Sequence, residues 1–343
     1  MDSAINYSAP STQDSAFRCN TPCRPTGCTV VVDASTDKSP YIGPLPSFRK
    51  ITPDSMDEIW PFLLKENGRT TDFSYGGLLM WVETFGYEYA IFNQTLFIKG
   101  VVEDNRAVPA FSLPIGRMPI AESVRMLHTY CRMAGISLEF SAVPEYALEE
   151  FEKAGAKRVE PLSDWSDYLY PAEQLAALKG KKMSKKRNHV NQFISLNPEW
   201  SAEPLTDSNL PETMDFMVTY DSQLDNAPMG HEESRLAREA IRLCASGRTR
   251  YVGMVLRDGN GRICALSVGD IKNDTLYVHI EKADRNVPGS YEMINREFAA
   301  SICAAHPEIR FINREDDSGD LGLRLAKESY HPCEMLRKYN VFF

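Results

Sequence analysis

The sequence predicts an α/β protein of the α+β kind, with two tandem domains that each contain a mixed, mostly antiparallel sheet flanked by helices. The first reason is that one order of elements (helices, antiparallel strands, crossover helix, strand, helix, strand) occurs twice along the chain. The second is a pair of turn signals between strand-like segments, Asn93-Gln94 and Asp258-Gly259-Asn260-Gly261. The third is length, because 343 residues suffice for about two domains.

The composition is that of an ordinary globular protein, with 43% hydrophobic and 25% charged residues. The formal net charge of -9 argues against general coating of nucleic acid or an anionic membrane, but it allows a local basic site. No apolar run approaches the roughly 20 residues of a transmembrane helix, and the N-terminus lacks a signal-peptide pattern. We therefore expect a cytoplasmic protein without a transmembrane segment. No spacing of histidines or cysteines indicates a metal site.

The chain divides into a tail and two domains. Residues 1–45 are rich in Ser, Thr and Pro, which predicts a disordered tail. The N-terminal domain is expected over 46–162 and the C-terminal domain over 163–343. The first is predicted to contain helices at 53–64, 75–85, 121–134 and 145–154, and strands at 87–92, 95–102, 107–113, 136–142 and 157–159. The second is predicted to contain helices at 210–224, 232–246 and 321–329, a further helix beginning near 290, and strands at 250–256, 263–271, 275–282, 309–313 and 334–343.

The chain is organised around the stretch 275–305. Its first eight residues alternate, which predicts a strand whose polar face is formed by Thr275, Tyr277, His279 and Glu281. The loop that follows leads into the N-terminus of a helix and contains Arg285, Gly289 and Ser290. Unpaired N–H groups at a helix N-terminus suit an anion, so these loop residues are candidates to bind one. The alternative is that Gly289 serves only the turn.

A basic segment lies between the two copies, with the sequence KGKKMSKKRNHVNQ at 179–192. It holds six Lys or Arg residues and no acid. Flanking apolar residues predict a basic helix over 179–196 that buries one side and projects its cations from the other. Such a run is usually a solvated helix face. In an acidic chain, however, a positive patch is also a natural phosphate contact.

Two segments carry a resemblance to a known family: 165–193, which contains YLYPAEQLAALKGKKMSKKRNHVNQF, and 311–332, which reads FINREDDSGDLGLRLAKESYHP. Both resemble the family named for the C-terminal domain of phosphatidylglycerol lysyltransferase. That family is similar to the Fem-type aminoacyl transferases in having two N-acetyltransferase-like (GNAT) folds in tandem. The resemblance covers about 48–343 and implies this fold, acyl transfer, an aminoacyl-tRNA donor and a lipid-headgroup, amine or hydroxyl acceptor.

Two departures from the known members limit what the resemblance implies. Characterised members carry a multi-span membrane region ahead of the catalytic part, and no such region occurs in this sequence, so the lipid acceptor stays open. The loop 285–290 has one Gly where the GNAT coenzyme A signature has two. No cofactor is therefore expected, and acyl-CoA stays a possible alternative donor.

The cleft of the second domain is the predicted site, because adjacent parallel strands would end together there. We expect carboxylates to hold the donor's α-ammonium and any basic side chain, namely Glu281, Asp316 and Asp317. Asn313 and His279 would face the substrate, and Arg314 would contact phosphate or orient the carboxylates. Tyr330 is a candidate proton donor by analogy with N-acetyltransferases. The alternatives are that the acids cap the next helix, that Tyr330 is a core residue and that His279 is structural.

The basic helix would then serve an RNA donor. Its cations would follow the tRNA acceptor stem through phosphate contacts, namely Lys181, Lys182, Lys185, Lys186 and Arg187. Two other functions compete with aminoacyl transfer: acyl-CoA-dependent N-acyl transfer, and non-catalytic binding by a protein that keeps the fold.

Overall fold

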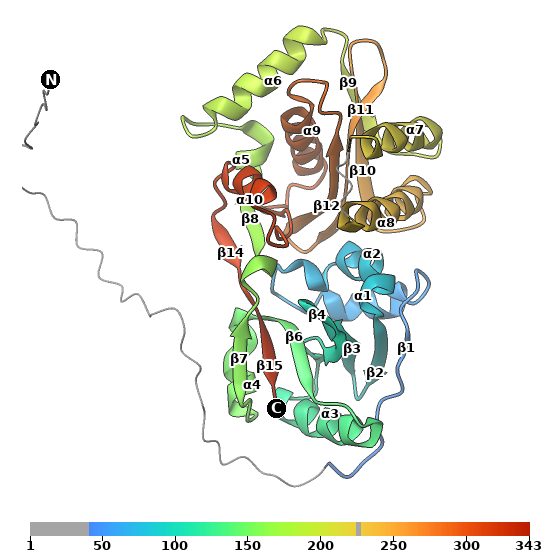
Figure 1. The fold of residues 1–343 in the computed structure, drawn as a ribbon, viewed down its shortest axis with the longest axis vertical. Helices are drawn as coiled ribbons and strands as arrows, with labels where there is room; N and C mark the ends of the chain where they lie inside the picture. The colour runs from blue at the N-terminus through green and yellow to red at the C-terminus, as the bar shows by residue number, and fades with distance from the viewer. Residues whose placement is uncertain (1–40, 224–227) are drawn as a thin grey trace, which may run out of the picture.

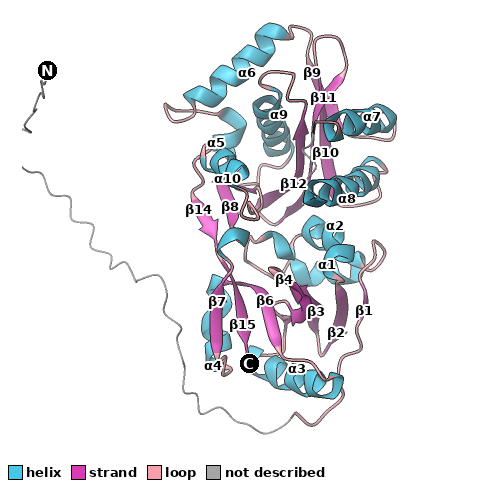
Figure 2. Ribbon diagram, in the orientation of Figure 1, coloured by secondary structure: helices cyan, strands magenta, loops and turns pink. Residues whose placement is uncertain are grey.

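The computed structural model describes residues 41–223 and 228–343, so most of the predicted tail at 1–45 lies outside the described residues. Two mixed sheets flanked by helices form the described chain, one above the other in Figure 1, which confirms the predicted fold class. Figure 2 shows strands in each half with helices packed around them, and places α1 and α2 of the lower half next to the upper half. Within the described ranges, every helix is too short or too polar to cross a bilayer.

The first sheet has the strand order β1-β2-β3-β4-β6-β15-β7, with β5 paired to β3. Its strands are β1 (Arg49–Lys50), β2 (Glu88–Phe92), β3 (Thr95–Val102), β4 (Asn105–Phe111), β5 (Ile115–Gly116), β6 (Glu139–Pro144), β7 (Arg158–Pro161) and β15 (Lys338–Phe342). Asn93 and Gln94 both have positive φ, as a two-residue hairpin turn requires, so the predicted β2–β3 hairpin is confirmed.

The second sheet has the strand order β14-β8-β13-β12-β11-β10-β9. Its strands are β8 (Asp167–Pro171), β9 (Ser201–Pro204), β10 (Tyr251–Arg257), β11 (Ile263–Lys272), β12 (Thr275–Ala283), β13 (Phe311–Asn313) and β14 (Glu334–Leu336). The β10–β11 hairpin is confirmed. Strands β8 and β9 were not predicted, because short strands bounded by proline give little alternation to detect.

Helices cover both faces of the second sheet, with α9 on one face and α7 and α8 on the other (Figure 1). The helices are α1 (Met56–Leu63), α2 (Tyr75–Phe85), α3 (Ile120–Ala134), α4 (Leu148–Lys153), α5 (Ala172–Ala177), α6 (Ser184–Leu196), α7 (Leu210–Asp221), α8 (Pro228–Ala245), α9 (Ser290–Ala305) and α10 (Leu321–Glu328). A short 3-10 helix, η1 (Thr71–Phe73), precedes α2. One core runs from the first domain to the α7–α8 face, and a second core lies under α9.

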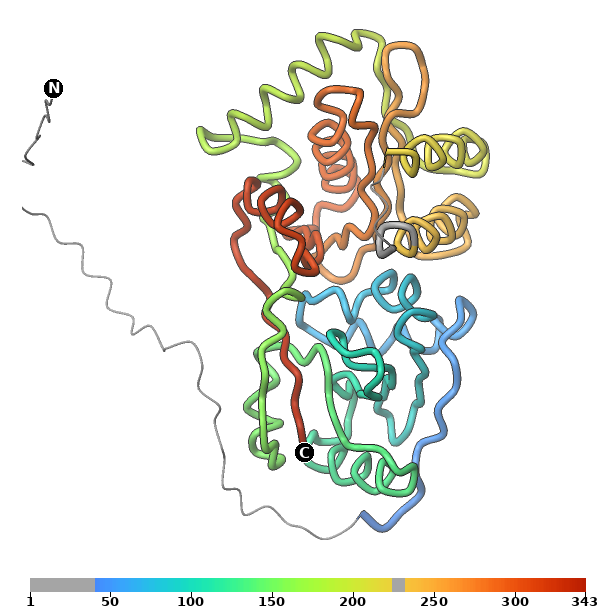
Figure 3. The backbone as a smooth tube through the Cα atoms, viewed as in Figure 1, coloured from blue at the N-terminus to red at the C-terminus, as the bar shows by residue number. Residues whose placement is uncertain are grey.

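The two halves exchange strands. The predicted single strand at 334–343 is wrong, because the chain pairs with β8 as β14 and then crosses into the first sheet as β15, between β6 and β7. In Figure 3 this last segment runs from the upper half down into the lower one. Buried Lys338 starts β15 and forms ion pairs with Asp72 and Asp167, at 2.9 and 2.8 Å. The chain division expected at 162/163 is therefore crossed by the C-terminal strand.

The basic helix is shorter than predicted. Instead of one helix over 179–196, α5 ends at Ala177 and α6 begins at Ser184. The break follows from the left-handed φ angles of Leu178 and Gly180, 48° and 86°, which no α-helix contains. Arg187 closes this turn, because its guanidinium donates to the carbonyl oxygens of both residues.

Candidate functional site

The candidate site lies where β12 and β13 separate. The two strands pair in parallel only from Thr275↔Phe311 to Tyr277↔Asn313, and β12 then continues to Ala283 without β13. A β-bulge falls at His279, because Val268 pairs with Ile280 while Gly269 pairs with Val278. Polar side chains from the two diverging segments fill the space between them.

The bulge divides the polar face that the alternation predicted. Before it, Val278 belongs to the core under α9, whereas Ile280, two residues later, belongs to the core shared with the first domain. His279 consequently points to the first domain and Glu281 to α9. The expected single polar face is therefore wrong, and two separate clusters replace it.

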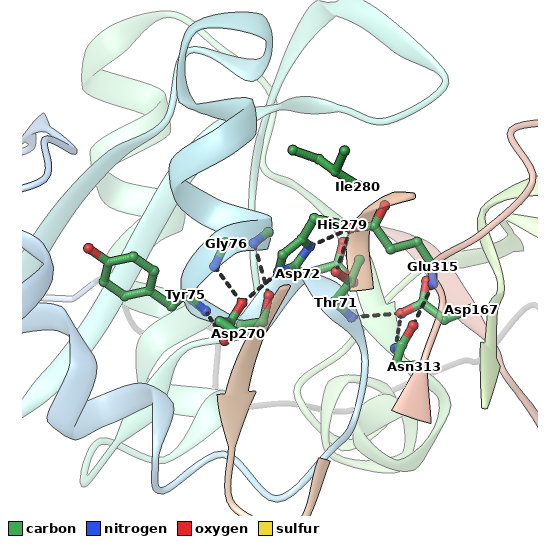
Figure 4. A network of polar contacts seen from close by, with 12 residues as sticks. Thr71, Asp72, Tyr75, Gly76, Asp167, Asp270, His279, Ile280, Asn313 and Glu315 are labelled. Carbon is green, nitrogen blue, oxygen red and sulfur yellow. Dashed lines mark hydrogen bonds and ion pairs between the residues drawn. The ribbon is translucent and has the colours of Figure 1, made fainter. Parts of the chain in front are cut away.

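The first cluster, the joint cluster, connects the two domains (Figure 4). The imidazole of His279 lies between two carboxylates, with Nε2 2.5 Å from Asp270 and Nδ1 2.7 Å from Glu315. Asp270 also accepts hydrogen bonds from the backbone N–H groups of Tyr75 and Gly76 at the start of α2. Gly76 must lack a side chain here, because a Cβ would lie 2.3 Å from the His279 ring.

The charge state of His279 follows from these contacts. Burial alone would lower its pKa, but the hydrogen bonds that the ring donates to Asp270 and Glu315 outweigh burial and raise the pKa to about 10. The ring is therefore an imidazolium at neutral pH, and it has no free nitrogen with which to accept a proton from a substrate. His279 was proposed to face the substrate; in the structure it joins the domains.

Asn313 also connects the two domains. Its amide donates to Asp167 at 2.8 Å and to the carbonyl oxygen of Arg69 at 2.6 Å, while its side-chain oxygen accepts from the N–H of Glu315. Asp167 also accepts from the N–H of Thr71, at 2.6 Å. All the polar groups of the Asn313 side chain are thus engaged within the joint cluster.

The second cluster, the Arg314 cluster, comprises Lys186, Glu281, Glu292, Asn295, Arg314 and Tyr330. Glu281 stands at its centre, accepting from Arg314 Nη2 at 2.7 Å and from Asn295 Nδ2 at 2.9 Å. A second polar atom of each partner, Arg314 Nη1 and Asn295 Oδ1, is buried and has no hydrogen-bond partner. An unpaired buried donor and acceptor are costly, and here one carboxylate holds both side chains.

Tyr330 lies against two cations in this cluster. Lys186 Nζ is 4.0 Å and Arg314 Cζ 4.7 Å from the centre of its ring. The side chain is 5% exposed, and burial raises the pKa of its hydroxyl far above the usual value. Lys186 pairs with Glu292 at 3.4 Å, and burial lowers its pKa. The cluster thus contains a protonated phenol between cations that are themselves paired.

The other predicted acids bind different partners from those of Glu281. The carboxylate of Asp317 accepts from Tyr168 at 2.5 Å and from Arg324 at 2.7 and 2.9 Å. That of Asp316 accepts from the backbone and the hydroxyl of Ser318, both at 2.9 Å. The predicted set of three converging carboxylates is not formed, because the tight turn before α10 uses two of them.

The residues of the predicted anion-binding loop mostly contact other segments of the chain. Gly289 caps α9 with φ 79°, and a Cβ there would lie 2.2 Å from the backbone oxygen of His189 in α6. The Ser290 hydroxyl donates to the carbonyl oxygen of Asp284, and the N–H of exposed Arg285 donates to the side chain of Gln223. The close approach of α6 is therefore a sufficient reason for the glycine.

The basic residues separate into two groups. Lys181, Lys182 and Lys185 are exposed. Lys186 turns inward to Tyr330, and Arg187 holds the turn before α6. Of the five cations predicted to follow RNA, the first three are thus presented to solvent.

Sequence reasoning missed Asn295 and Glu292. Asn295 sits on the buried face of α9 beside Met293 and Ile294, and a polar residue in an apolar helix face is the signal that identifies it. A polar pocket of about 320 Å³ lies elsewhere, where the α1–η1 loop meets the turn before β12, and Arg69 pairs with Asp274 at its edge.

Comparison with known proteins gives consistent results. The sequence profile of the family described as phosphatidylglycerol lysyltransferase, C-terminal, matches residues 64–342. A conserved protein of unknown function from Bacteroides thetaiotaomicron VPI-5482 has a TM-score of 0.80 at 29% identity, with 87% of this chain and 100% of that chain covered. A C-terminal DUF2156 domain from Agrobacterium fabrum has a TM-score of 0.59 at 14% identity, with 84% and 91% covered.

The likeness to Fem-type proteins is one of fold. FemX has a TM-score of 0.55 at 9% identity, with 87% of this chain and 97% of that chain covered.

An uncharacterized protein from Mycoplasmoides gallisepticum is 24% identical over 177 residues, which are 51% of this chain. The match spans 56% of that curated relative's length.

Proposed function

Because this chain belongs to the phosphatidylglycerol lysyltransferase C-terminal family, we propose that it is an acyltransferase that moves an aminoacyl group from aminoacyl-tRNA to a hydroxyl or amine. A lipid headgroup is the first acceptor to test, because the family's description names one. The observation that carries the proposal is the unpartnered pair of atoms on either side of Glu281, Arg314 Nη1 and Asn295 Oδ1.

An aminoacyl ester offers one hydrogen-bond acceptor for Arg314 Nη1 and one donor for Asn295 Oδ1. Its carbonyl oxygen would accept from Arg314 Nη1, which then also stabilises the oxyanion as negative charge develops. Its α-ammonium would donate to Asn295 Oδ1, close to the negative charge of Glu281. One short ligand would thus satisfy a buried donor and a buried acceptor together.

The reaction needs one proton transfer. The acceptor's oxygen or nitrogen forms a bond to the ester carbonyl carbon, and the bond from that carbon to the tRNA ribose oxygen then breaks. Tyr330 is assigned to protonate the leaving oxygen, since its raised pKa keeps the hydroxyl protonated at neutral pH. The proton released by the acceptor restores the phenol, so the enzyme ends unchanged.

The donor's RNA would bind the exposed lysines of the α5–α6 segment. The triple change of Lys181, Lys182 and Lys185 to Ala is expected to weaken tRNA binding. It should also reduce the slope of log affinity against log salt concentration by the contribution of about three phosphate contacts. Filter binding across a salt series measures both quantities. The matched control is the same change at exposed lysines of the first domain, Lys50, Lys65 and Lys157. Equal losses in both triple variants would remove this role.

Transfer itself is tested with tRNA charged with labelled amino acids. The full chain is incubated with this tRNA and vesicles containing a glycerol-headgroup anionic lipid, or with hydroxyl and amine compounds, and the label is followed into product. Loss of ester with labelled product supports the proposal. Stabilisation by acetyl-CoA but not by charged tRNA, measured as melting temperature, would favour acyl-CoA-dependent N-acyl transfer instead. Stabilisation by a ligand without any product would favour a binding protein.

A further inference from the structure

The Arg314 cluster has a charge balance that bears on the donor's side chain. Its two cations are each paired within the cluster, Arg314 with Glu281 at 2.7 Å and Lys186 with Glu292 at 3.4 Å. All four of these side chains are largely buried, with exposed fractions from 11% to 17%. Each carboxylate among these six residues is therefore already paired with a cation of the protein.

The two cations also converge on one ring. Lys186 and Arg314 both lie within 5 Å of the centre of Tyr330, at 4.0 and 4.7 Å. The charge of Arg314 contributes to the lowered pKa of Lys186, although burial is the larger cause. The ring of the proposed proton donor therefore lies directly against two cations, and the carboxylates paired with them, Glu281 and Glu292, balance their charge.

The acids that the sequence offered for a basic side chain are engaged elsewhere. Asp317 is held by Arg324 and Tyr168, and Asp316 by Ser318, both in the turn before α10. The α-ammonium of an aminoacyl group finds Asn295 Oδ1 and Glu281 in the proposed geometry. A second ammonium on the side chain would meet Lys186 and Arg314 instead.

We infer that this site takes aminoacyl groups whose side chains are neutral or acidic, and that it disfavours lysyl and arginyl donors. The inference rests on the proposed aminoacyl transfer, and it departs from the lysyl group in the family's description. Lys186 is the residue that sets this preference, because it adds positive charge at Tyr330 without contacting the central carboxylate, Glu281.

The test uses adenosine analogues in which an amide replaces the 3′ aminoacyl ester, bearing alanine, glutamate or lysine. Calorimetry on the full chain gives three dissociation constants. We expect the alanyl and glutamyl analogues to bind at least about tenfold more tightly than the lysyl analogue, because like charges brought together in a desolvated site repel. Equal or tighter binding of the lysyl analogue overturns the inference and leaves aminoacyl transfer in place. Binding of none of the three overturns both proposals.

A single substitution checks the role of Lys186. Lys186→Gln removes the charge but keeps much of the side chain. The dissociation constants of the alanyl and lysyl analogues should therefore become more nearly equal in this variant. If Lys186 had only a structural role, the substitution would weaken the binding of all three analogues equally. That result would contradict a role of Lys186 in donor preference. The matched control is Lys157→Gln at an exposed position of the first domain, which should leave the ratio unchanged. Melting temperatures of both variants verify that they are folded.

Discussion

In both domains the last strand of a hairpin runs parallel to the strand that follows a crossover helix, but the two junctions are filled by different chemistry. In the first domain β4 ends at Phe111, which pairs with Phe140 of β6. Aromatic rings occupy this junction, with Phe140 6.1 Å from Phe111 and 4.7 Å from Phe151 between ring centres. In the second domain β12 passes its last pair with β13 and brings His279 and Glu281 into the gap.

This difference indicates at which junction packing alone does not account for the residues. Aromatic packing stabilises a fold by burial alone, whereas buried ion pairs cost desolvation that their mutual attraction only partly offsets. Replacement of such pairs by apolar residues is often neutral or stabilising. The charged junction of the second domain is therefore the one whose retention needs a functional reason. The first domain contributes the start of α2 to the joint cluster instead.

The first test of this comparison removes one aromatic ring from the junction of the first domain. Phe140→Ala creates a cavity at a fully buried position and should lower the free energy of unfolding by about 3–5 kcal/mol. Denaturant unfolding measures this loss. Phe92→Ala, at a half-buried end of β2, is the control and should cost clearly less. Under conditions where Phe140→Ala stays folded, its affinity for charged tRNA should match that of the unmodified chain; a large loss would mean that the first junction takes part in binding.

The Arg314 cluster should respond in activity more than in stability. Arg314→Lys keeps a cation near Glu281 but removes the planar fork and its second nitrogen, so the transfer rate should fall by about 10²–10³-fold. Single-turnover transfer from charged tRNA measures the rate. Arg324→Lys is the control, because Arg324 binds Asp164 and Asp317 outside the Arg314 cluster. Similar rates for Arg314→Lys and the unmodified chain would remove Arg314 from the mechanism.

The joint cluster should give the smallest of the three effects, and it should depend on pH. The pKa of His279 is raised to about 10 in the folded chain, against about 6.5 when unfolded. A raised pKa means that the folded state holds the proton more tightly. The stabilisation from His279 is thus complete below about pH 6.5 and is lost as the pH rises toward 10.

His279→Gln isolates this contribution. The variant should lose about 3 kcal/mol at pH 6, because Asp270 stays buried without its cation. Its stability should fall less than that of the unmodified chain between pH 6.5 and 10. Urea unfolding across this range gives both curves. Parallel curves would show that the ring is not charged in the folded chain.

Local patterns predicted most elements and failed where distant segments decide. The β2–β3 hairpin followed from Asn93 and Gln94, and α9 followed from its apolar spacing, because both depend on neighbours in the chain. The bulge at His279 did not follow, since it depends on the pairing of β12 with β11. The contacts of Lys186 did not follow from the sequence for the same reason. Its inward direction is set by Tyr330 and Glu292, which are remote in sequence.

The sequence by itself determined the family, the tandem α/β architecture, and Glu281, Arg314 and Tyr330 as residues of interest. The architecture follows from the order of local patterns, whereas the family and the choice of Tyr330 follow from the resemblance of two sequence motifs. Only the tertiary structure decided that β15 completes the first sheet, that His279 joins the domains, and that Asn295 and Lys186 stand beside Glu281 and Tyr330. The physical reason is that burial, ion pairing and strand exchange depend on which distant surfaces meet, and a local pattern does not encode that.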